Sequence, residues 1–286
     1  MTSRHRLPAQ FALSISLLLG GCATTNISLQ EVRDFADQSA QLGSYAELST
    51  RFRDTYAREQ LYLPQAAERL GKETDVKRRA VYDDFVSAQK AVVLYLQTLS
   101  LLAGDARYDL TNKLDDLGNG IKANVESGLE QKHVLAYAGM TRLLTRVIAS
   151  GYQGGSVETM VRDGDRDLQT LLDAMLTLTR FYAKTHENEK KTILGMFDVE
   201  MPFATRPQDR MLVTLAKVHY FNKSAEYKIL DKRYELALQG LTKVSLGHQK
   251  LRENLANLRG EEIKNILVSY VRDLQAIRTG LSANQN

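Results

Sequence analysis

Cysteine, tryptophan and proline are rare or absent in this chain of 286 residues. It contains one cysteine, Cys22, and no tryptophan. A single cysteine excludes a disulfide within the chain. The prolines are Pro8, Pro64, Pro202 and Pro207, so no proline interrupts the long segment between Pro64 and Pro202. Because a proline costs about 3 kcal/mol inside a helix, this scarcity permits long helices.

An excess of one charge and long hydrophobic runs are missing as well. The 38 basic and 34 acidic side chains give a formal net charge of +4, and no segment has the roughly 18 uninterrupted apolar residues of a typical transmembrane helix. A nearly balanced chain gives no electrostatic reason to expect nucleic-acid binding. The sequence also lacks the Gly-x-Ser-x-Gly, phosphate-loop and His-Glu-x-x-His patterns. We therefore predict no catalytic residues and no cofactor.

One short apolar run is present at the N-terminus. Arg4 and Arg6 precede it, the run extends from Phe11 to Leu19, and small residues follow. A basic start, an apolar stretch and small residues form the three-part layout of a secretory signal peptide. The run is too short to cross a bilayer as a helix. These features predict export of the chain.

The end of this run, Leu19-Gly20-Gly21-Cys22, resembles the lipobox of bacterial lipoproteins. The resemblance covers only residues 1–25. It implies cleavage between Gly21 and Cys22, a diacylglyceryl group on the Cys22 thiol, and acylation of the new amino group. Ala23 stands where the inner-membrane retention signal of the family has Asp, which implies the outer membrane, with the body facing the periplasm. The alternative is that Cys22 is a buried or free thiol.

Loss of residues 1–21 would change the composition of the mature chain. Arg4 and Arg6 would be removed with no acidic residue, so the net charge would fall from +4 to +2 and 265 of the 286 residues would remain. Several acyl chains, at about 0.8 kcal/mol for each buried methylene, would hold Cys22 in a membrane. The first predicted partner is therefore a membrane, bound through acyl chains on Cys22.

Apolar residues recur with the spacing of an α-helix along most of the chain. One stripe advances in alternating steps of four and three residues through Val81, Phe85, Ala88, Val92, Tyr95, Leu99 and Leu102. A second consists of Met211, Leu215, Val218, Asn222, Ala225 and Ile229. Similar stripes lie within residues 137–147, 161–182, 241–258 and 263–281. A strand would need a period of two, so each stripe is interpreted as the apolar face of a helix that packs into the protein.

These patterns predict an all-α fold, an elongated bundle of about six to seven long antiparallel helices. A capping-box pattern from Ser28 to Glu31 would start the first helix, which would run to about Tyr62. Further helices are expected at 64–104, 108–126, 129–150 and 156–195, the last one capped by its first residue, a serine. Two long helices, or one helix kinked at Gly240 or Gly247, would complete the chain.

The expected organisation has five parts: a signal peptide at 1–21, a lipidated tether at 22–27, an N-terminal helical bundle region at 28–196, a connecting loop at 197–207, and C-terminal helices at 208–286 that pack on the same bundle. The connecting loop is the longest irregular connection in this scheme, and such loops often carry binding residues. The candidate partner-binding residues are Phe197, Asp198, Glu200, Phe203 and Arg206.

Two patterns have part of a metal site. Glu130 and His133 have the Glu-x-x-His spacing of di-iron helical bundles, but no second such motif occurs. Asp163–Asp167 is rich in aspartate, but Leu168 and Ala174 stand where a calcium loop has Gly and Glu. No metal is predicted, and Glu130 and His133 are the candidate ligands if one is present. Otherwise His133 begins a helix on its inward face.

Other polar residues are interpreted as structural. His248 lies on an apolar stripe and is expected to be a hydrogen-bonded core residue. The charged runs at 76–80 and 186–191 are interpreted as solvated helix surface.

Three classes of function remain. The first is a non-catalytic, lipid-anchored helical module that binds an envelope protein partner as an adaptor, assembly factor, scaffold or toxin-neutralising protein. The second is a carrier or sensor with a pocket for a lipid or another apolar ligand. The third is an envelope hydrolase or metal enzyme. The anchor, the long helices and the missing catalytic motifs favour the first class.

Overall fold

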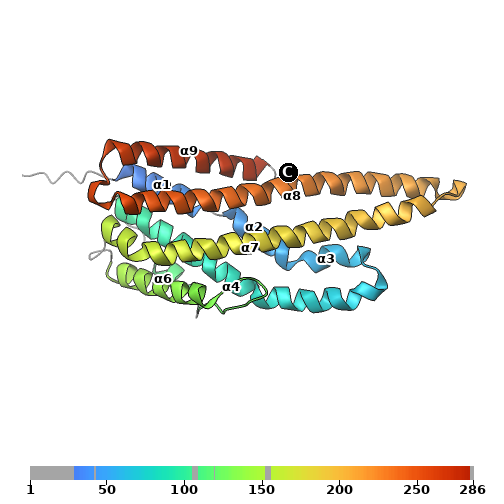
Figure 1. The fold of residues 1–286 in the computed structure, drawn as a ribbon, viewed down its shortest axis with the longest axis horizontal. Helices are drawn as coiled ribbons and strands as arrows, with labels where there is room; N and C mark the ends of the chain where they lie inside the picture. The colour runs from blue at the N-terminus through green and yellow to red at the C-terminus, as the bar shows by residue number, and fades with distance from the viewer. Residues whose placement is uncertain (1–28, 42, 105–108, 119, 152–155, 284–286) are drawn as a thin grey trace, which may run out of the picture.

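A computed structural model describes residues 29–41, 43–104, 109–118, 120–151 and 156–283. Every regular element in these residues is helical, and the one β-type contact is an isolated bridge between Asn124 and Leu129. The helices pack against one another as an elongated bundle (Figure 1). The prediction of an all-α bundle is confirmed.

The α-helices are α1 (Gln30–Ala40), α2 (Gly43–Arg53), α3 (Thr55–Glu59), α4 (Gln65–Ala103), α5 (Thr111–Asp115), α6 (Gln131–Ala149), α7 (Val157–Glu200), α8 (Arg210–Glu253) and α9 (Glu261–Ala283). Short 3-10 turns connect some of them: η1 (Gln60–Tyr62), η2 (Met201–Phe203), η3 (Pro207–Asp209) and η4 (Leu255–Asn257). At 1.5 Å per residue, α7 and α8 are each about 66 Å long.

Most of the hydrophobic core lies at the end of the molecule where α1 begins. There α1 packs on α4 and α9, α6 packs on α7, and α4 crosses α7 (Figure 1). The stripe from Val81 to Leu99 is buried in this core, as predicted. Burial contributes about 1.5–3 kcal/mol for each large apolar side chain, so this stripe is a main source of the stability of α4.

α4 also contains an 18-residue window that is long and apolar enough to cross a membrane by length and composition alone, with a mean hydropathy of 1.3. Within the described part of the chain, no other helix meets these criteria. In the structure, 56% of this window is buried against other helices. The packing therefore accounts for the apolar character of α4.

The N-terminal helix expected to run to Tyr62 is divided into α1, α2, α3 and η1. α1 ends before Gln41, and α2 begins at Gly43. Glycine is about 1 kcal/mol less favourable than alanine inside a helix, so a break next to Gly43 costs little. Ser28, the expected cap, lies outside the described residues. The serine cap expected further along is confirmed, since the Ser156 hydroxyl accepts a hydrogen bond from the Thr159 amide at 3.1 Å.

The prediction of a helix at 108–126 is wrong for most of this range. Among the described residues of this range only α5 is helical, and Gly118 and Gly120 follow it with positive φ angles of 71° and 125°. This conformation is not that of a right-handed helix and is readily adopted by glycine, so the chain at Gly118 and Gly120 does not continue the helix.

Of the two alternatives expected for the end of the chain, the structure has two long helices, α8 and α9, and α8 is continuous through Gly240 and Gly247. A β-carbon at Gly247 would lie 2.3 Å from the ring of Phe35. Gly247 is therefore the place where α1 comes close to the α8 backbone. The chain turns instead between α8 and α9, through η4.

Candidate functional site

The α7–α8 hairpin extends beyond the other helices at the end of the molecule away from the start of α1 (Figure 1). α7 continues to Glu200, η2 and η3 reverse the chain, and α8 starts at Arg210. We call residues 193–230 the hairpin tip. The end of this hairpin projects past the other helices in Figure 1, and several of its large apolar side chains are exposed.

A small hydrophobic cluster holds the two helices of the hairpin tip together. Ile193 and Phe197 of α7 belong to one cluster with Tyr227 and Leu230 of α8, apart from the main core. Tyr62 closes the cluster on one side, and its hydroxyl lies 2.8 Å from Nε2 of His219. The side of α8 that faces α7 is thus occupied by packing within the chain.

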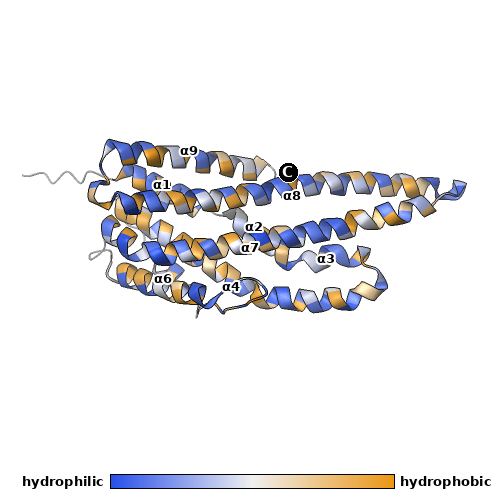
Figure 2. Ribbon diagram, in the orientation of Figure 1, coloured by the Kyte–Doolittle hydropathy of each residue, from blue (hydrophilic) through white to orange (hydrophobic). Residues whose placement is uncertain are grey.

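The opposite side of α8 is apolar and exposed. Met211 is 76%, Leu215 62% and Val218 53% exposed. At 3.6 residues per turn these three fall within an arc of about 60°, on the other side of the helix from Ala216 and Tyr220, which pack with the small cluster. Apolar residues are visible along this part of α8 in Figure 2. The prediction that this stripe packs into the protein is wrong.

The stripe continues toward the bundle through Asn222, Ala225 and Ile229, all of which are exposed. Farther along α8, other helices cover the same face. Leu236 is the nearest side chain to Gly280 of α9, and Gly247 lies under Phe35 of α1. Because α9 ends at Ala283, one turn after Gly280, it does not extend over the hairpin tip. We call the exposed residues Met211, Leu215, Val218, Asn222, Ala225 and Ile229 the open seam.

Phe197, Asp198 and Glu200 were expected in a loop. They lie instead in the last turn of α7. The reason is that α7 is longer than predicted and the irregular connection correspondingly shorter. Asp198 and Glu200 are exposed, whereas Phe197 is buried in the small cluster. Phe197 thus takes part in the packing between α7 and α8, and its expected contact with a partner stays a prediction.

The other two predicted residues lie in the turn itself. Phe203, in η2, is 78% exposed. Arg206 forms an ion pair with Asp209, with Nε 2.9 Å from Oδ2. Leu212 and Phe221 are also exposed beside the open seam. The stripe on α8 was recognisable in the sequence, but its spacing gave no sign that it would be exposed rather than buried.

Buried charges fix the base of the hairpin tip. The Glu189 carboxylate in α7 is 1% exposed and accepts hydrogen bonds from Arg51 of α2 at 3.0 Å and from Arg58 of α3 at 2.7 and 3.0 Å. The Tyr227 hydroxyl donates to it at 3.1 Å. Burial by itself would raise the pKa of Glu189, but the hydrogen bond from Arg58 and the charges of both arginines lower it below the usual value. Four helices therefore meet at one carboxylate.

A second polar group lies beside this network. The Nε2 atom of His186 is 3.0 Å from Asp231, which also receives a hydrogen bond from Lys190. Burial and the nearby charge of Arg51 lower the pKa of His186, against the opposing effect of Asp231. The interpretation of residues 186–191 as solvated surface is wrong for His186 and Glu189, since both are buried in the packing between α7 and α8.

His248 is a hydrogen-bonded core residue, as expected. Its Nδ1 atom lies 2.9 Å from Asp165, and its Nε2 atom lies 2.7 Å from the hydroxyl of Tyr95. That hydroxyl donates to the Met160 carbonyl at 3.1 Å. Burial would raise the pKa of Asp165, but the hydrogen bond and charge of His248 lower it overall. Asp165, the central residue of the acidic pattern, thus serves to join α7 to α8.

Glu130 and His133 form the N-terminal cap of α6. The Glu130 amide donates a hydrogen bond to Nδ1 of His133 at 2.9 Å. His133 is buried on the inward face at the start of the helix, and its Nε2 atom lies 3.5 Å from Asp173. In the described residues, no group of three or more His, Cys, Asp or Glu side chains is arranged to hold a metal ion. The cap explains the spacing of Glu130 and His133.

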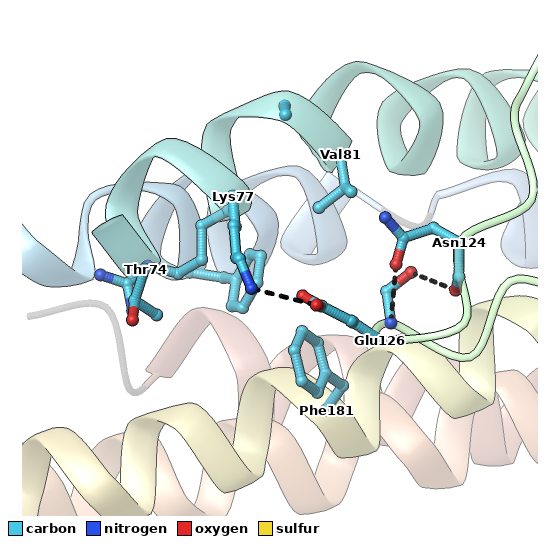
Figure 3. A pocket seen from close by; sticks show the side chains of 10 residues that line it. Thr74, Lys77, Val81, Asn124, Glu126 and Phe181 are labelled. Carbon is cyan, nitrogen blue, oxygen red and sulfur yellow. Dashed lines mark hydrogen bonds and ion pairs between the residues drawn. The ribbon is translucent and has the colours of Figure 1, made fainter. Parts of the chain in front are cut away.

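A cavity of about 310 Å³ opens between α2, α4, α7 and the segment before α6. Its apolar lining includes Phe52, Val81 and Phe181, and its polar lining includes Asn124. Figure 3 shows the ion pair between Lys77 and Glu126 at this cavity, with N and O atoms 3.0 Å apart. Cavities of this volume can accept small molecules. It is the second candidate site in the described structure.

Gly21 and Cys22, the predicted cleavage and lipidation positions, lie outside the described residues. No protein-family model, curated protein or solved structure matches this chain.

Proposed function

We propose that this protein is a lipid-anchored, non-catalytic adaptor of the cell envelope that binds an α-helix of a protein partner along the open seam. One observation carries the proposal: a regular apolar stripe on α8 is exposed on the side opposite the packing within the hairpin. Exposed apolar patches of this kind are typical of interaction sites in soluble proteins.

The spacing of the open seam supports a helical partner. Its residues advance in steps of four, three, four, three and four, the pattern of alternating core positions in a coiled coil. Farther along α8, this face already packs against another helix, α9. A partner helix on the open seam would lie beyond the end of α9 and extend the same type of packing. The partner is thus expected to contain an amphipathic helix with a heptad repeat.

Asn222 is the polar member of the open seam. An asparagine at a core position of a coiled coil lowers stability but restricts the register and the number of helices. Asn222 would therefore be matched by a polar residue of the partner helix. Leu212 and Phe221, which are exposed on either side of the seam, would widen the apolar contact.

The predicted anchor is compatible with this role. Residues 22–28 span at most about 25 Å, whereas the hairpin helices are about 66 Å long. α1 begins at the end of the bundle away from the hairpin tip (Figure 1). Acyl chains on Cys22 would therefore hold the bundle near the outer membrane, facing the periplasm, with the tip able to extend away from it. Confinement to this layer raises the effective concentration for a partner there.

Site-specific photo-crosslinking in intact cells tests the proposal. A photoreactive residue is placed at Leu215 or Asn222, and at Lys217, an exposed residue on another face of α8. We expect crosslinks from the first two positions to one helix of one envelope protein, in which the crosslinked residues also have heptad spacing. Lys217 should give little product.

Matched variants complete the test. Leu215→Gln combined with Val218→Gln should abolish the crosslink at position 222, and Lys217→Gln should leave it unchanged. Cys22→Ser should reduce it by releasing the protein from the membrane. Equal crosslinking from both faces of α8, or a crosslink that persists in the double variant, would show that the open seam is not the binding surface.

A further inference from the structure

The face of α8 that carries the open seam continues beyond Ile229, and there α9 covers it. A β-carbon at Gly240 would lie 3.5 Å from Ile277 of α9, and α8 is a continuous helix through this stretch. A helix that binds the seam therefore meets the end of α9 and has to stop there. The occupant of the seam must accordingly have an apolar stripe close to one end of a helix.

A second copy of this chain has such a helix. α8 begins at Arg210, one residue before the first residue of the seam. The steps between seam residues, four, three, four, three and four, are the same in both directions along the chain. Two α8 helices that run antiparallel about a twofold axis level with position 220 thus place each seam residue opposite another one: Met211 opposite Ile229, Leu215 opposite Ala225, and Val218 opposite Asn222.

We propose that the helix bound to the open seam is the first part of α8 from a second copy of this chain, packed antiparallel. This inference rests on the proposed function, because it names the occupant of the same surface. A parallel pair would require each continuous α8 to run on past residue 229 into the space that α9 of the other copy fills. In the antiparallel pair each α8 begins before it reaches the other copy's α9, so α9 selects this direction.

The side chains of the seam suit the antiparallel pairing. Leu215 would lie opposite Ala225, so a large and a small side chain share one layer, as in well-packed cores. The two Asn222 side chains would lie on either side of the twofold axis, about 6 Å apart along the helices, which brings their amides within reach of each other. The second copy thus supplies the polar residue that Asn222 requires.

Phe221 gains a partner in the same arrangement. Its side chain is 70% exposed on the flank of the seam. Because it is next to the twofold axis, the Phe221 residues of the two copies would be displaced by only about 3 Å along the helices. Rings placed in this way can make an aromatic contact. The pairing therefore covers an exposed aromatic side chain that lies outside the seam itself.

The exposed apolar area of the tip is sufficient for a weak dimer. The large apolar side chains of the seam and its flank are between 36% and 76% exposed. Pairing two copies would bury on the order of 1,200 Å² in total, the lower limit for a specific interface. We therefore expect a dissociation constant in the micromolar range. Confinement of anchored copies to one membrane surface would raise their effective concentration and favour the dimer.

Sedimentation equilibrium of the full chain with Cys22→Ser measures the self-association without acyl chains. We expect a monomer–dimer equilibrium with a micromolar dissociation constant. Leu215→Gln combined with Val218→Gln should weaken it at least tenfold, because both apolar layers are lost in each copy. Lys217→Gln, on another exposed face of α8, should leave it unchanged. A chain that stays monomeric at about 200 µM would overturn the proposal.

Introduced cysteines determine the direction of pairing, because Cys22 is the only native thiol. In the Cys22→Ser chain, a mixture of Leu215→Cys and Ala225→Cys proteins should give a dimer crosslinked by a short bismaleimide that contains one copy of each. Leu215→Cys alone should give little product, since its two thiols would be about 15 Å apart along the helices. Lys217→Cys is the control for random collision. Efficient crosslinking of Leu215→Cys to itself would indicate parallel pairing and overturn the proposal.

The outcomes separate this inference from the proposed function. A purified chain that stays monomeric, together with photo-crosslinks in cells from the open seam to a different protein, would overturn the self-pairing and support the adaptor role. Photo-crosslinks in cells between copies of this chain, lost in the Leu215→Gln and Val218→Gln double variant, would support the self-pairing. Equal crosslinking from both faces of α8 would overturn both.

Discussion

Replacing Glu189 with glutamine would leave two guanidinium groups without the carboxylate that they share. The side chains of Arg51 and Arg58 are 16% and 24% exposed, and Glu189 is 1% exposed. Removing one partner of a buried ion pair typically costs 3–5 kcal/mol. Because both arginines retain some contact with water, we expect the lower end of this range, a loss of about 3 kcal/mol in the free energy of unfolding.

Chemical denaturation by urea, followed by circular dichroism at neutral pH, measures this loss. By thermal unfolding, about 3 kcal/mol corresponds to a Tm lower by roughly 6–12 °C for a chain of this size. Glu187→Gln is the matched control, since Glu187 lies on the same helix and pairs with Lys190 at the surface. A half-exposed pair of this kind should contribute less than about 1 kcal/mol.

The pH dependence provides an independent test. The pKa of Glu189 is lower in the folded protein than the ordinary value of the residue. Its ion pairs therefore stabilise the fold fully above the unfolded pKa of about 4.3, and the stabilisation is lost as the pH falls through the folded pKa. Glu189→Gln does not titrate, so the difference from the native chain should shrink below about pH 4. A constant difference down to pH 3, or a Glu189→Gln protein as stable as Glu187→Gln, would refute the reasoning.

Three further outcomes are expected from denaturation measurements. Gly247→Ala should cost about 1–3 kcal/mol, because its β-carbon would overlap Phe35. Gly195→Ala, where the new carbon would meet no atom of another helix within 4 Å, should gain up to about 1 kcal/mol from helix propensity. Equal effects at the two glycines would contradict the close approach of α1 to α8. Tyr95→Phe should cost about 1–3 kcal/mol by leaving a buried histidine and a carbonyl without their shared hydroxyl, and a neutral effect would rule out that hydrogen-bond chain. Leu215→Gln should change stability by less than about 0.5 kcal/mol, because Leu215 is exposed; a loss of several kcal/mol would mean that the seam is covered in solution.

Some buried charged residues could have been predicted from the register of the apolar stripes. Tyr182, His186, Glu189, Ile193 and Phe197 follow one another in steps of four and three, and all are buried. Arg78 similarly lies three residues before Val81, the first residue of the stripe on α4. For a charged residue in this chain, its position in the register of an apolar stripe therefore predicts burial better than the polarity of the residues beside it. The partners of Glu189, by contrast, are Arg51 and Arg58, which lie 138 and 131 residues away in sequence, so they could not be predicted.

The sequence by itself determined that the chain is helical. Helix formation depends on local properties: few prolines, serine at the start of a helix, and apolar residues at a period near 3.6. The buried stripe on α4 and the cap at Ser156 were predictable for this reason. The tertiary structure decided which stripes are covered. The stripe that begins at Met211 has the same spacing as the buried ones, yet it is exposed because α9 ends before it reaches the hairpin tip. Burial depends on the position and length of a neighbouring helix, and no local pattern in α8 contains that information.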